Sequence, residues 1–123
     1  MNITIDRQGS SKVAVIESMD VIIRDAQDAL DLMASVNYHH ECNKILLQKA
    51  NLTEDFFDLK TRLAGEILQK YVNYNVKLAI VGDFDSYASK SLKDFIYECN
   101  NGNQIFFLRD KQAAVLALHN ITN

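Results

Sequence analysis

The sequence predicts an α/β fold in which helices pack on a short, mixed, mostly parallel sheet. Short apolar runs rich in β-branched residues alternate along the chain with segments of helical periodicity. The apolar fraction of 48% and the charged fraction of 24% are those of an ordinary globular protein. A length of 123 residues suits one hydrophobic core, so we expect a single α/β domain over residues 1–123.

The chain is expected to open with an antiparallel hairpin followed by an amphipathic helix. Residues 2–6 and 12–17 read as strands, and Gly9 lies in the polar connection between them. Asp25 is a typical N-cap residue, and apolar residues then recur at helical spacing as far as Asn37.

Residues 44–48 form a short apolar run typical of a buried central strand. Thr53 is then expected to cap a long second helix, with Glu54 and Asp55 in the first turn, where the helix dipole favours negative charge. An apolar stripe on this helix is expected to cover the sheet, and it comprises Phe56, Leu59, Leu63, Ile67 and Tyr71.

Residues 76–81 form the strongest strand pattern, which stops at Gly82. A third helix is expected over residues 89–100, a last strand over residues 104–108, and a final helix that Asp110 caps. The order is therefore β-β-α-β-α-β-α-β-α, which implies parallel pairing with right-handed crossovers after the hairpin. Four side chains should be buried in neighbouring central strands, namely Ile45, Leu47, Leu78 and Ile80.

The net charge and the hydropathy of the sequence argue against two classes of binding partner, nucleic acids and membranes. The net charge of −3, with 13 dispersed Lys and Arg residues, disfavours nucleic-acid binding. No segment approaches the roughly 20 apolar residues of a membrane span, and the N-terminus has no signal-peptide pattern. We therefore expect a cytoplasmic protein with no membrane partner, in which Cys42 and Cys99 are reduced thiols.

No metal, cofactor or catalytic residue is predicted. The potential ligands at residues 39–42 are adjacent in sequence, and no spaced second pair accompanies them. His119 is interpreted as a favourable charge at a helix C-terminus. The five tyrosines are expected to pack mainly in the core rather than to line an aromatic pocket.

The best place for a binding site is the carboxyl edge of the central strands, where open α/β sheets commonly bind ligands. Two parallel strands would end there together and bring residues 51–58 near residues 82–86. The same residues also suit ordinary turns, so both interpretations stay open. The candidate binding residues are Asn51, Thr53, Asp58, Arg62, Gly65, Gly82, Asp83 and Asp85.

The polar face of the second helix gives two of these candidates. Asp58 with Arg62 has the i,i+4 spacing of an exposed helical ion pair, as has Glu66 with Lys70. Gly65 costs about 1 kcal/mol relative to alanine inside a helix, which suggests that another backbone, a partner or a ligand approaches it closely.

Five stretches of the sequence, at residues 25–33 (DAQDALDLM), 55–61 (DFFDLKT), 64–70 (AGEILQK), 77–84 (KLAIVGDF) and 89–98 (SKSLKDFIYE), resemble a family of small bacterial proteins known as domain of unknown function 4180. The resemblance extends over nearly the whole chain. It implies a small stand-alone bacterial protein and brings no assigned activity.

The order of elements is also similar to that of the STAS domain of anti-sigma factor antagonists, in which a small β/α module binds a regulatory partner. In those antagonists a phosphorylated serine begins the helix after the central strand, and the comparable stretch here is residues 51–55. Thr53 is the hydroxyl available there, but Glu54 and Asp55 beside it would oppose a phosphate.

Two functions follow as hypotheses. The first is a non-enzymatic regulatory module that binds a protein partner or associates with itself. The alternative is a small-molecule or nucleotide-binding protein, with weak enzymatic activity at most, that uses residues 82–86 with Arg62 or Lys60. Binding of a ligand to the folded state would raise the melting temperature, whereas a protein partner would be recovered by affinity purification.

Overall fold

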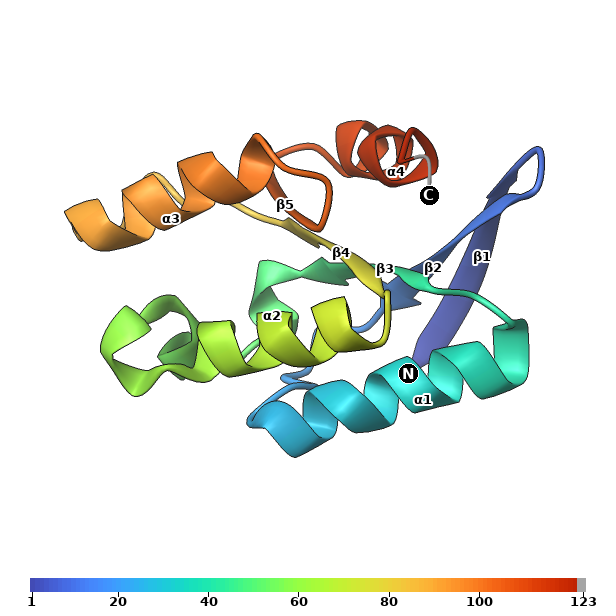
Figure 1. Cartoon of the computed structure of the whole chain (residues 1–123), viewed down its shortest axis with the longest axis horizontal. Helices are drawn as coiled ribbons and strands as arrows, with labels where there is room; N and C mark the ends of the chain where they lie inside the picture. The colour runs from blue at the N-terminus through green and yellow to red at the C-terminus, as the bar shows by residue number, and fades with distance from the viewer. Residues whose placement is uncertain (122–123) are drawn as a thin grey trace.

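A computed structural model of the chain describes residues 1–121, which form a five-stranded mixed sheet and four α-helices (Figure 1). The strands are β1 (Asn2–Gln8), β2 (Ser11–Glu17), β3 (Lys44–Gln48), β4 (Lys77–Val81) and β5 (Ile105–Leu108). The helices are α1 (Ala26–His40), α2 (Leu63–Asn73), α3 (Lys90–Asn100) and α4 (Lys111–His119). The predicted order of elements is confirmed.

The strands are arranged in the sheet in the order of the sequence. β1 pairs antiparallel with β2, and β2, β3, β4 and β5 are parallel neighbours. Ile45 lies opposite Leu78 and Leu47 opposite Ile80, and all four are buried as predicted. Gln48 lies opposite Val81, so β3 and β4 release the chain at the same edge.

Helices cover both faces of this sheet. Connections of the same hand, which add each strand beside the last, place their helices on a common face. Accordingly α1, α2 and α3 share one core with Ile45, Leu47 and Ile80, whereas α4 packs on the opposite face over Leu46 and Ala79. Figure 1 shows α1 and α2 below the strands and α4 above them.

Local signals in the sequence fix the ends of the elements. Gly9 has a φ of +60° in the two-residue turn between β1 and β2, a conformation that glycine adopts readily. Three helices have side-chain N-caps, in which Asp25 accepts from Asp28 N, Ser89 from Leu92 N and Asp110 from Ala113 N.

The long helix predicted from Thr53 is wrong, because two 3₁₀ turns lie between Thr53 and α2. These turns are η2 (Glu54–Phe57) and η3 (Leu59–Thr61). The Asp58 side chain accepts from Lys60 N and starts η3, and Arg62 takes a left-handed conformation with a φ of 67°. Both features interrupt the α-helical hydrogen bonds, so α2 starts only at Leu63.

Phe56, Leu63 and Ile67 are nevertheless buried in the core beneath α1, α2 and α3, as predicted. The expectation for the tyrosines is wrong for three of them, because Tyr38, Tyr74 and Tyr97 are exposed on helix surfaces or at a helix end. Tyr71 is buried in α2, as expected.

Within residues 1–121, both cysteines are free thiols. Cys42 is buried, and its thiol donates to the carbonyl oxygens of Lys12 and Lys44, each at 3.3 Å from Sγ. Burial, with Glu98 nearby, raises the pKa of Cys99 to about 11. None of the helices in this part of the chain has the length and apolar character needed to traverse a lipid bilayer.

Candidate functional site

Asn51 proves to be a fully buried structural anchor. Its Oδ1 accepts from Gln48 N at 2.8 Å, and its Nδ2 donates to the carbonyl oxygens of Ser18 and Asp20, each at 2.9 Å. The Asn51 carbonyl oxygen also accepts from the backbone of Ile22 and Ile23. Asn51 thus connects the segment after β3 to the segment that leads into α1 by hydrogen bonds.

Thr53 and Asp58 belong to the 3₁₀ segment. The Thr53 side chain makes no capping hydrogen bond, whereas its backbone N donates to Ile23 O at 3.0 Å. Among residues 1–121, no hydrogen bond or ion pair joins Asn51, Thr53 or Asp58 to Asp83 or Asp85. The segment after β3 and the segment after β4 do meet at the carboxyl edge, but through residues that were not among the predicted candidates.

Lys49 is the first of these missed residues. Its side chain lies against Gly82, where an added Cβ would come within 2.5 Å of Lys49 Cβ. Its Nζ donates to Asp83 O at 3.0 Å and lies 4.6 Å from the centroid of the Tyr87 ring, a cation–π distance. Gly82 is therefore required by close packing at the end of β4.

Asp83 and Asp85 lie in an exposed loop and both pair with Arg109, which follows β5. Arg109 contacts Asp85 directly and approaches Asp83 Oδ1 at 3.5 Å. Asp83 Oδ1 also accepts from Asp85 N at 2.9 Å. The loop carboxylates and the nearby cation thus satisfy one another, an arrangement that leaves little positive charge for a phosphate group.

Aromatic rings hold this loop to the rest of the molecule. Phe57 stacks on Tyr87 with centroids 5.3 Å apart, and Phe84 meets Phe107 edge to face at 5.4 Å. The Tyr87 hydroxyl donates to Glu54 at 3.1 Å. Burial, together with that acceptor, raises the pKa of Tyr87 to about 12, so its hydroxyl stays protonated at neutral pH.

Arg62 and Gly65 lie elsewhere, in a hollow between α2 and α3 that we call the α2–α3 hollow. Its volume is about 550 Å³, and its lining is Leu59, Arg62, Gly65, Glu66, Gln69, Lys70 and Phe95. The structure places nothing within 4 Å of a Cβ added at Gly65. α2 packs mainly on α1 and α3 mainly on β5, so the two helices leave this surface open between them.

The helical ion pairs predicted beside Gly65 are absent from residues 1–121, since neither Asp58 with Arg62 nor Glu66 with Lys70 makes one. Asp58 lies before α2, outside the helix that would align it with Arg62. The charged side chains of Arg62, Glu66 and Lys70, which line the hollow, therefore remain available to bind another molecule.

The interpretation of His119 as a charged end of a helix is also incomplete. It is the last residue of α4, but its side chain is 1% exposed and bonded to Asp6 and Ser11. A pairing between residues more than 100 positions apart leaves no local signal in the sequence. His39, His40, Glu41 and Cys42 do not converge, and residues 1–121 hold no group of three potential metal ligands.

One comparison with known proteins gives a match. The sequence model of a family described as "Domain of unknown function (DUF4180)" matches residues 8–118. No curated protein and no solved structure matches the chain. The family match covers all of the elements from β2 to α4 except the final residue of α4.

Proposed function

The chain belongs to the DUF4180 family, and we propose that it is a non-enzymatic protein-interaction module whose partner binds in the α2–α3 hollow. The observation that carries this proposal is that two residues lining the hollow are poorly suited to their own backbone positions. Arg62 occupies a left-handed conformation, and Gly65 occupies a helix.

The left-handed conformation at position 62 ends η3, but neither the arginine there nor the glycine at position 65 has a structural reason within the chain. A left-handed conformation costs a residue with a Cβ roughly 1–2 kcal/mol, and glycine would remove that cost at position 62. Gly65 has neither a positive φ nor a neighbour that excludes a side chain. Such conflicts between residue and backbone commonly mark functional sites, because selection retains them for something other than stability.

The hollow suits a polypeptide segment. Leu59 and Phe95 supply apolar surface, and Gly65 lets a partner backbone come close. Arg62 and Lys70 place two positive charges on the rim beside the single negative charge of Glu66. A partner helix with an apolar stripe and an acidic residue at its margin would complement this surface.

A regulatory role in the cytoplasm accompanies the proposal. The element order resembles that of STAS domains, which bind regulatory partners. We propose that residues 1–123 act as one such domain. Asp83 and Asp85, paired with Arg109 at the carboxyl edge, lie outside the lining of the hollow.

The test compares leucine substitutions at two positions, one in the hollow and one elsewhere on the surface. Gly65→Leu fills the hollow, and it is expected to abolish binding of the partner recovered by affinity purification from the native host, while the domain stays folded. Asp31→Leu on the exposed side of α1 adds a similar side chain elsewhere on the surface and should bind the purified partner as the parent does.

Binding constants measured with the purified partner show whether it binds in the α2–α3 hollow. If Gly65→Leu binds with the affinity of the parent, the partner lies on another surface and the proposal is wrong. Circular dichroism of each variant separates a loss of binding from a loss of folding.

A further inference from the structure

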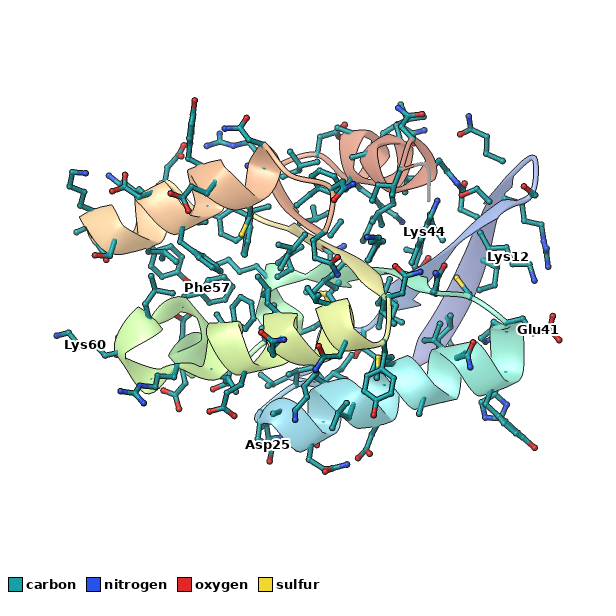
Figure 2. All side chains as sticks on the ribbon, in the orientation of Figure 1. Lys12, Asp25, Glu41, Lys44, Phe57 and Lys60 are labelled. Atoms are coloured by element: carbon teal, nitrogen blue, oxygen red, sulfur yellow. The ribbon has the colours of Figure 1, made fainter. Side chains whose placement is uncertain are left out.

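A second cavity, also of about 550 Å³, lies at the amino-terminal edge of the parallel strands. It is bounded by the β1–β2 turn, the start of β3 and the end of α4. Its lining includes Gly9, Ser11, Lys12, Lys44, His119 and Ile121. Figure 2 shows Lys12, Glu41 and Lys44 near one end of the molecule, and Phe57 and Lys60 near the other. The cavity is therefore separate from the α2–α3 hollow.

The Lys44 side chain is the main polar feature of this cavity. Lys44 is 6% exposed, and its Nζ donates to Ser11 Oγ at 3.0 Å and to Ile121 O at 3.4 Å. Both acceptors are neutral. Lys44 forms no ion pair with any carboxylate in residues 1–121, so its charge is buried without a counter-ion there.

Lys77 adds to this excess of positive charge. It lies directly opposite Lys44 in the β3–β4 register, is 8% exposed, and donates to the neutral Gln104 Oε1 at 3.1 Å. Burial lowers the pKa of Lys44, with Cys42 opposing the shift and Lys77 adding to it. Two buried lysines side by side are unfavourable unless negative charge reaches them.

The third component is a chain of hydrogen bonds that fixes Ser11. His119 Nε2 lies 2.7 Å from Asp6 Oδ1, and His119 Nδ1 lies 2.8 Å from Ser11 Oγ. With Nε2 donating to the Asp6 carboxylate, a neutral His119 accepts the Ser11 proton at Nδ1. Asp6 is thus engaged on the far side of the imidazole, and it does not neutralise Lys44.

We propose that this cavity binds a small organic oxyanion, whose carboxylate or phosphate group bonds to the Lys44 ammonium group, which Ser11 holds in place. The ammonium group has three hydrogens, of which Ser11 Oγ and Ile121 O accept two, so one remains for an anion. The bound anion provides a counter-charge that no carboxylate within residues 1–121 supplies to Lys44. Lys12, at the wall of the cavity, donates from Nζ to His40 O at 3.2 Å and adds a second positive charge to a lining whose one carboxylate is the exposed Glu41.

The ligand is more than an inorganic ion. A volume of about 550 Å³ falls in the range of small-molecule sites, roughly 300–1,000 Å³. The anionic group would lie deep in the cavity beside Lys44, and the remainder of the molecule would extend along the β1–β2 turn at Gly9.

The test is an NMR titration of the full chain with sodium phosphate and, separately, with sodium butyrate at constant ionic strength. Saturable changes in the amide signals of Ser11, Lys12, Lys44 and His119 are expected with at least one of the two anions. The anion that saturates identifies the group as phosphate or carboxylate. Changes no larger than those produced by sodium chloride for both anions would overturn the proposal.

Two matched lysine variants assign the binding to Lys44. Lys44→Met should weaken the affinity at least about tenfold, the effect of losing a charge-assisted hydrogen bond. Lys77→Met removes an equally buried lysine outside the cavity lining and should retain binding. Equal affinity in Lys44→Met and the parent contradicts the proposal.

If Lys44→Met does not fold, Ser11→Ala keeps the charge and removes the hydrogen bond that positions Lys44 Nζ toward the anion. A loss of affinity in that variant supports the site, and parental affinity refutes it.

Discussion

At the scale of single residues, Gly82 and Gly65 differ in whether the surrounding structure has room for a side chain. At Gly82 the Cβ and Cδ of Lys49 occupy the space that a side chain would need. At Gly65 the space is empty, and the backbone is helical with a negative φ. The first glycine is explained by packing, whereas the second lowers helix stability without any compensation inside the chain.

Alanine substitutions should therefore have opposite signs at these two positions. Gly82→Ala forces a shift against Lys49 Cβ, which is not a flexible side-chain end, and should lower the free energy of unfolding by about 1–3 kcal/mol. Gly65→Ala should raise it by roughly 0.5–1 kcal/mol. Urea unfolding monitored by circular dichroism measures both, and equal effects at the two sites would contradict the packing described for Gly82.

The segment between β3 and α2 is the part of the fold that a sequence pattern describes least well at the scale of elements. The apolar stripe continues from Phe56 through Leu63 to Ile67, and all three residues are buried. Helical periodicity alone therefore predicts one helix. The break depends on the local hydrogen bonds of Asp58 and Thr61, whose hydroxyl donates to the Asp55 and Asp58 carbonyl oxygens.

Asn51 is expected to be the residue on which this segment depends. Asn51→Ala leaves the backbone groups of Gln48, Ser18 and Asp20 without their side-chain partner and should cost about 2–4 kcal/mol of stability. Asn73→Ala, which removes one exposed hydrogen bond to Gln69, serves as the control and should change stability by less than about 0.5 kcal/mol. A near-neutral Asn51→Ala would mean that Asn51 does not anchor the segment.

At the scale of the whole molecule, strand patterns and caps sufficed to predict the topology. The apolar runs at β3 and β4, and the capping residues Asp25, Ser89 and Asp110, are local features, so one sequence reveals them. The parallel pairing of β3 and β4 follows from the intervening helix. Their shared carboxyl edge was predicted for the same reason.

The contacts that bring distant side chains together could not be predicted in this way. Lys49 meets Gly82 because two strands end in register, and His119 meets Asp6 because α4 folds back across the sheet. Neither pair has a characteristic spacing. Arg62 and Gly65 were named from the sequence, but only the left-handed φ of Arg62 and the open space at Gly65 show why they belong to one surface.

Site-specific photo-crosslinking in the native host shows whether a protein partner occupies the α2–α3 hollow. A benzophenone amino acid replaces Gln69 in the hollow, Asp85 at the carboxyl edge or Leu116 on the exposed side of α4. A discrete crosslinked partner is expected from position 69 alone, and it should be lost when Gly65→Leu is added. A partner captured from position 85 or 116 and not from position 69 would contradict it.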